Sequence, residues 1–250
     1  MVENRRVVYL EQIIHISFIL FIISSLVSIS VAQMSIGLAA ITWFLSLYIK
    51  GGIKDVRTPL GITFLIFILA SILSIITSID IGMSLIHFKK LLQIIVFFLF
   101  VNNLKGLKEL SILTKILIMF AGVISLHGLF QGVQNGISLS TRVEGTMSIY
   151  MTFAGLLMLV DLIAISRVVF NPDLKKEWWL PILIVIITSC LLLTLTRNAW
   201  VGIVSGVFVI LFLKNRWLTF IIPLIIALFL VISPLTISKR ITSIIDPKDP

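Results

Sequence analysis

The chain has 250 residues, of which 59% are hydrophobic and only 12% are charged. An average soluble domain has about 25% charged residues, so this composition excludes a soluble globular fold and indicates a membrane protein. The net charge of +9 is compatible with nucleic-acid binding, but cationic loops beside membrane helices produce the same excess, and no nucleic-acid partner is expected.

A helix needs about 20 apolar residues to cross a bilayer, and the chain has about nine runs of suitable length. Transmembrane helices are predicted at 10–29, 32–49, 59–77, 85–102, 110–130, 147–166, 180–195, 198–213 and 217–236. No period-2 alternation lasts the length of a barrel strand. The predicted fold is therefore all-α, a polytopic transmembrane helical bundle spanning residues 1–236.

The distribution of lysine and arginine predicts the orientation of the bundle. With the N-terminus in the cytoplasm, 13 of the 20 cations fall in inner segments and 7 in outer ones, as the positive-inside rule requires. Arg5 and Arg6 followed by an apolar run and Ser30-Val31-Ala32 also fit a cleaved signal peptide. A retained helix is preferred because the apolar stretch is long, and cleavage would leave the remaining topology unchanged.

Residues 237–250 become polar and end at Asp246-Pro247-Lys248-Asp249-Pro250. With nine spans this segment lies on the extracytoplasmic side. We expect it to be the start of a truncated extracytoplasmic loop, and the chain to be a fragment of a longer protein.

Arg197 is the most informative of the outer cations. It lies in Thr194–Trp200, between the seventh and eighth predicted helices, with Thr196 as the N-cap. The helix dipole disfavours a cation in the first turn, whereas a phosphate or diphosphate there would meet a guanidinium and free N–H groups. The alternative is an interfacial arginine that extends to lipid headgroups, and both interpretations stay open.

Other outer cations are candidates for the same anion site. Arg142, in the loop before the sixth helix, is either a second anion ligand or half of a surface pair with Glu144. Lys89 and Lys90 open the fourth span, and Lys239 and Arg240 follow the ninth. The candidate diphosphate-binding residues are Arg142 and Arg197, joined by Lys89, Lys90 and Arg240.

Several residues carry weaker hypotheses. Gln131 is interpreted either as a sugar contact or as a solvated loop residue. Asp161 lies within a span and is a functional candidate by default, or a structural partner of Arg167 or of a neighbouring helix. Cys190 is expected to be a small core residue. His15, His87 and His127 lie far apart without ligand spacing, so no metal is expected, and no cofactor is predicted.

Two segments resemble motifs of the O-antigen ligase/polymerase superfamily. Thr194–Trp200 resembles its Thr-x-Thr-Arg-Ser-x-Trp segment, and Arg142 to Gly155 resembles its Arg-x-x-Gly-x-x-x-x-Pro-x-x-x-Ala segment. Tyr150 or Met151 stands where the family often has Asn-Pro. Arg240–Pro247 looks like the start of the family's large extracytoplasmic loop. These motifs cover about 30 residues of a chain whose hydropathy resembles the family throughout.

The resemblance implies a GT-C-type, metal-independent glycosyltransferase of the bacterial inner (cytoplasmic) membrane. Such an enzyme passes a glycan from an undecaprenyl-diphosphate carrier to a glycan, lipid or protein acceptor, as in lipopolysaccharide and other surface polysaccharides. Arg142 and Arg197 would then hold the diphosphate leaving group. The catalytic residue is unknown, because the family's histidine is expected beyond Pro250, and His127 does not replace it. The 250 residues alone are expected to be inactive.

Two other classes of function stay open. An anion or small-solute transporter would fit the hydropathy, but no paired Gly/Pro breaks occur in matching halves. A non-catalytic membrane scaffold would leave the outer cations with lipid contact only.

Overall fold

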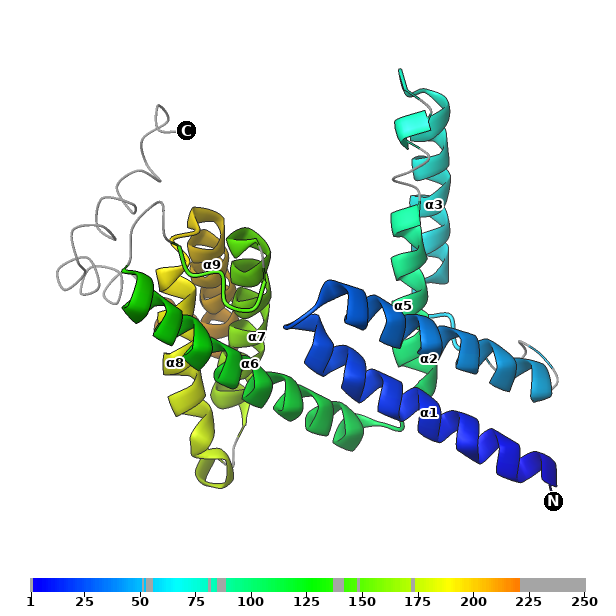
Figure 1. Ribbon diagram of the computed structural model, residues 1–250, viewed down its shortest axis with the longest axis horizontal. Helices are drawn as coiled ribbons and strands as arrows, with labels where there is room; N and C mark the ends of the chain where they lie inside the picture. The colour runs from blue at the N-terminus through cyan, green and yellow to red at the C-terminus, as the bar shows by residue number, and fades with distance from the viewer. Residues whose placement is uncertain are drawn as a thin grey trace. The chain divides into compact units, whose positions relative to one another are not determined.

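The computed structural model describes residues 2–50, 52, 56–80, 82–84, 89–136, 142–147, 149–171 and 174–220. Every element in these ranges is a helix (Figure 1), which confirms the all-α fold class. The α-helices are α1 (Val2–Ser25), α2 (Ile29–Ile49), α3 (Gly61–Ile76), α5 (Ile94–Asn103), α6 (Leu107–Asn135), α7 (Tyr150–Phe170), α8 (Trp179–Leu193) and α9 (Arg197–Lys214). Short 3-10 helices are η1 (Lys89–Gln93), η2 (Leu174–Glu177) and η3 (Arg216–Phe220).

The helices identify a multi-pass membrane protein. Five are long and apolar enough to cross a bilayer, and they are Val7–Ser25, Ile29–Ile49, Leu107–Asn135, Tyr150–Phe170 and Arg197–Lys214. Three other predicted spans correspond to the shorter apolar helices Gly61–Ile76, Leu91–Asn103 and Trp179–Leu193. Most of the ninth predicted span, 217–236, lies outside the described residues. The total of about nine spans and their orientation stay predictions.

The apolar surface explains why these segments are helical. Only 11% of the α9 window is buried, and Val204, Phe208 and Phe212 are among its exposed side chains. Such a surface is stable in lipid, where a helix pairs its own backbone N–H and C=O groups. Pro181 lies in the first turn of α8, where its missing N–H breaks no helical hydrogen bond.

The chain forms two compact units, of which unit 1 comprises residues 1–22 and 30–111. Its core joins α1, α2 and α5 through buried Phe18, Trp43 and Leu99. The Phe18 and Phe100 rings stack with their centroids 4.2 Å apart. Lys50 and Lys105 each lie 3.1 Å from the Glu11 carboxylate. Unit 1 is therefore held by an aromatic core with ion pairs near its edge.

Unit 2 comprises residues 23–29 and 112–250. Within its described part, α7 packs against both α8 and α9 (Figure 1). The core includes Ile118, Phe153, Leu157 and Ile187, whose side chains are fully buried. Leu26, just after α1, belongs to the same core, so the end of the first helix is packed into unit 2. Cys190 is also buried there, as the sequence predicts.

One end of unit 2 carries an ion-pair network around the buried Glu177. Arg167 donates two hydrogen bonds of 2.8 Å to its carboxylate, and the Lys115 Nζ lies 2.7 Å away. Asn171 donates a further bond of 3.0 Å. These contacts join α6, the end of α7 and η2. The hydrogen bond from Arg167, supported by Lys115, lowers the pKa of Glu177 from 4.5 to about 2 against the opposing effect of burial.

The Glu177 network predicts a pH-dependent stability. Because the folded pKa is lowered, the stabilisation is complete above pH 4.5 and is lost as the pH falls toward 2. We expect Glu177→Gln to lower the free energy of unfolding by roughly 3 kcal/mol at neutral pH. The difference in the free energy of unfolding between Glu177→Gln and the wild type should become smaller as the pH falls from 7 to 3. Thermal unfolding of the protein in detergent at each pH measures this difference.

Glu144→Gln is the matched control for this measurement. Glu144 lies at the other end of unit 2, and no ion pair is found for it among the described residues. Its replacement should leave the stability nearly unchanged at both pH values. A Glu177→Gln variant as stable as the wild type at pH 7 would contradict the role given to the network.

Candidate anion-binding site

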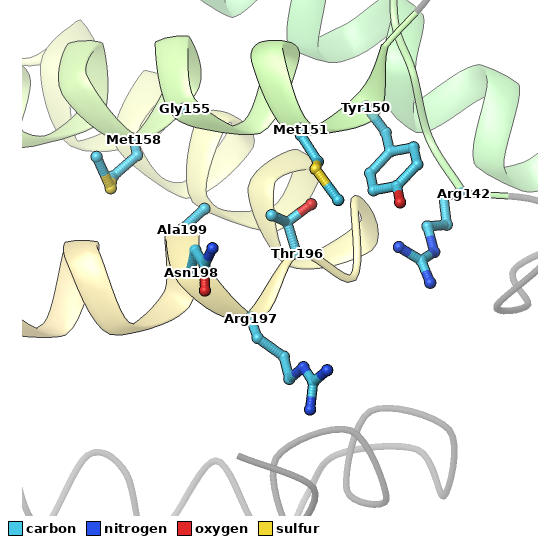
Figure 2. A pocket seen from close by; sticks show the side chains of 9 residues that line it. All are labelled: Arg142, Tyr150, Met151, Gly155, Met158, Thr196, Arg197, Asn198 and Ala199. Carbon is cyan, nitrogen blue, oxygen red and sulfur yellow. The ribbon is translucent and has the colours of Figure 1, made fainter. Parts of the chain in front are cut away.

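A pocket of about 300 Å³ lies at the other end of unit 2 (Figure 2). Its lining residues are Arg142, Tyr150, Met151, Gly155, Met158, Thr196, Arg197, Asn198 and Ala199. They come from the segment before α7, from the first half of α7 and from the start of α9. The pocket therefore unites two arginines that are remote in the sequence, and none of its described lining residues is a carboxylate.

The sharp turn between α8 and α9 positions Arg197. Leu195 has a φ of +52°, a left-handed conformation that is uncommon for a non-glycine residue. Its side chain is fully buried against Trp200, and this packing offsets the backbone strain. The turn starts α9 at Arg197 itself, so that the guanidinium belongs to the first helical turn.

Thr196 occupies the predicted N-cap position in an unusual way. Its backbone carbonyl accepts hydrogen bonds from Ala199 N and Trp200 N, but its side chain makes no capping bond. The hydroxyl instead donates to the Thr194 carbonyl at 3.3 Å. The Thr196 side chain therefore does not cap α9, and the positive end of the helix dipole lies at the pocket.

Arg142 reaches the pocket from the segment before α7. Its guanidinium carbon lies 4.5 Å from the centroid of the Tyr150 ring (Figure 2), within the range of a cation–π contact. Tyr150 is the first residue of α7, so the contact ties the arginine to the helix start. The motif resemblance marks Tyr150 only as a departure from the family pattern and does not indicate this contact.

Gly145 explains how the Arg142 segment fits so closely against α7. It has a φ of +62°, and a Cβ atom there would lie only 2.4 Å from the Phe153 ring. Val143, on the same segment, is 1% exposed. Only glycine permits both the left-handed backbone and the approach to Phe153.

Gln131, near the end of α6, lies behind this segment. Its side-chain oxygen accepts hydrogen bonds from the backbone N–H groups of Glu144 at 3.2 Å and Gly145 at 3.0 Å. It is not among the residues lining the pocket. The structure therefore gives Gln131 a backbone-holding role that neither interpretation of the sequence included.

The remaining cation candidates are not brought to the pocket by the described residues. Lys89 and Lys90 begin η1 in unit 1, and their side chains lie outside the described part. Lys239 and Arg240 lie wholly outside it. Their participation in the anion site stays a prediction, as does the diphosphate-binding role of Arg142 and Arg197.

Asp161 is buried in α7 with 0% exposure and pairs with a neighbouring helix. Thr188 of α8 donates a 2.6 Å hydrogen bond to its Oδ2, whereas Arg167 pairs with Glu177. Its Oδ1 has no hydrogen-bond partner among the described residues. Asp161 is thus a core residue outside the lining of the arginine pocket.

No group of three or more His, Cys, Asp or Glu side chains able to hold a metal is found in the described ranges. Compared with protein-family models, curated proteins and solved structures, the chain matches none.

The fold and the pocket define the chain as a multi-pass membrane protein with a cationic pocket at the start of α7 and α9.

The close contact at Gly145 makes this position intolerant of a side chain. Gly145→Ala should lower the free energy of unfolding by roughly 2–4 kcal/mol, because it adds backbone strain and a clash with Phe153. Thermal unfolding in detergent measures the loss. Gly155→Ala is the control, since a Cβ at Gly155 meets nothing within 4 Å. Equal stabilities of the two variants would contradict the close packing of the segment.

Proposed function

We propose that the chain is the membrane part of a glycosyltransferase of surface polysaccharide assembly. Its pocket would bind the diphosphate of an undecaprenyl-linked glycan, and the glycan would be transferred to an acceptor or polymerised. One observation carries the proposal: Arg142 and Arg197 line a single pocket at the start of a helix. The motif resemblance implies the same role for these two arginines.

The chemistry of the pocket suits a diphosphate. Two guanidinium groups in one pocket repel each other, and a ligand with two or more negative charges offsets that repulsion. Arginine binds phosphate oxygens in a bidentate manner, and the N-terminus of a helix such as α9 attracts phosphate groups. A carboxylate carries only one negative charge, so it would neutralise only part of the charge of the two guanidinium groups.

The apolar part of the lining suits a lipid carrier. Met151, Gly155 and Met158 follow one face of α7 away from the arginines (Figure 2). Methionine side chains adapt their shape to irregular apolar ligands. An amphiphile with its phosphate at the arginines would place its chain along these residues or in the surrounding lipid.

In the proposed transfer, an acceptor hydroxyl attacks the anomeric carbon of the glycan. The bond from that carbon to the carrier oxygen breaks, and the diphosphate leaves with the bonding electrons. Arg142 and Arg197 would stabilise the charge that develops on the departing oxygen. The hydroxyl proton passes to a general base, for which the resemblance implies a histidine.

A transporter is the alternative, and the buried Asp161 is the observation that favours it, because ionisable residues inside membrane spans often serve transport. Solute uptake and accumulation of lipid-linked glycan in a deletion strain separate the two functions. A transporter predicts loss of uptake in Asp161→Asn, whereas the glycosyltransferase predicts glycan accumulation in Arg142→Ala and Arg197→Ala.

The diphosphate proposal predicts a direct effect on binding. In the full-length protein, Arg142→Ala or Arg197→Ala should each weaken binding of farnesyl diphosphate by about ten- to a hundredfold, the loss of a charge-assisted hydrogen bond or two. Titration calorimetry of the purified protein in detergent measures the affinity. Glycan transfer in cells should be lost in parallel.

Arg216→Ala is the control, because Arg216 is an exposed arginine that begins η3 after α9. It should retain wild-type affinity, and expression levels of all three variants should be equal. Wild-type affinity in Arg142→Ala and Arg197→Ala would reject the assignment.

A further inference from the structure

The segment that follows Arg142 is held by contacts that do not involve the arginine. Val143 and Met147 are buried, and the Thr146 hydroxyl donates a 2.7 Å hydrogen bond to the Leu26 carbonyl at the end of α1. Between these anchors, the N–H groups of Glu144 and Gly145 point to Gln131. The segment is therefore fixed by three different parts of unit 2.

Gln131 makes the central contact of this arrangement. One amide oxygen accepts two successive backbone N–H groups at 3.2 and 3.0 Å, and both lone pairs of that oxygen are thereby used. Gly145 has a left-handed φ, so the two N–H groups converge on a single acceptor. Without that acceptor, two partly buried donors would lose their partner, which is costly in a poorly solvated region.

Arg142 lies close in the sequence to the residues that Gln131 holds. Arg142 lies two residues before Glu144, and its guanidinium is placed over Tyr150 by the course of the same segment. We infer that Gln131 is a positioning residue: it holds the 142–147 segment so that Arg142 reaches the anion pocket, while Gln131 itself does not touch the ligand. The inference rests on the proposed diphosphate site and names a residue that supports it.

The test replaces the acceptor and keeps the size of the side chain. In the full-length protein, Gln131→Met should weaken farnesyl diphosphate binding by about tenfold. Gln131→Glu retains an acceptor oxygen and should stay within about threefold of the wild type, since the two N–H bonds are preserved. Gln134→Met, an exposed glutamine in the same helix, is the matched control and should bind as the wild type does.

A double-mutant cycle separates positioning from general destabilisation. If Gln131 acts through Arg142, Gln131→Met should have little further effect in the Arg142→Ala background, but its full tenfold effect in the Arg197→Ala background. A general loss of structure would weaken binding in both backgrounds. Full additivity with Arg142→Ala, or wild-type binding by Gln131→Met, would overturn the inference.

Hydrogen exchange distinguishes failure of this inference from failure of the proposed function. The Glu144 and Gly145 amides should exchange at least tenfold faster in Gln131→Met than in Gln134→Met, whether or not ligand is present. If the wild type binds no farnesyl diphosphate, the diphosphate site is rejected, and the exchange rates alone decide whether Gln131 holds the segment. Unchanged exchange would overturn the holding role even where binding is strong.

Discussion

The satisfaction of backbone hydrogen bonds in an apolar environment is the constraint on which the rest of this structure depends. A helix pairs its own N–H and C=O groups, so long apolar runs are stable in lipid only as helices. The groups at helix ends lack such partners and need side chains, water or ligands. Polar chemistry is therefore concentrated where α6, α7, α8 and α9 begin and end.

The two ends of unit 2 meet this requirement in different ways. At the Glu177 end, Arg167 and Lys115 share one buried carboxylate, and Asn171 adds a hydrogen bond. The two cations there share one acidic partner within the protein. At the opposite end, the connections are made by the Gln131 amide, the glycine turn at Gly145 and the strained turn at Leu195. None of these three connections uses a charged side chain.

The features that depend on local sequence patterns are predictable from the sequence. Hydropathy runs predict α6, α7 and α9 because a span is a property of consecutive residues, and Thr196 is recognisable as an N-cap from the helix that follows it. The shared pocket of Arg142 and Arg197 agrees with their predicted location on one side of the membrane. Two predicted spans separate the two loops, so span parity predicts that both loops lie on the same side of the membrane.

Contacts between side chains that are far apart in the sequence are not predictable from local patterns. The partners of Asp161 and Arg167 depend on how α7 rotates against α8 and η2, and hydropathy does not specify rotation. Gln131 had no motif to mark it, since its effect appears only when two N–H groups of another segment face it. Gly145 is a sequence signal for a turn, because glycine adopts a positive φ readily. The glutamine that faces this turn lies 14 residues away in the sequence.

The asymmetry between the two ends bears on what the pocket binds. If Arg142 and Arg197 served only to anchor the protein at the lipid headgroups, they would have no need of a common pocket or of a rigid segment to carry them. A surface arginine keeps its rotamer freedom, which is worth up to about 2 kcal/mol. Here the backbone directly after Arg142 is fixed by the glycine turn at Gly145, the buried side chain of Val143 and two backbone hydrogen bonds to Gln131. Such preorganisation reduces the entropy lost on binding, and it benefits a ligand that engages both arginines at once.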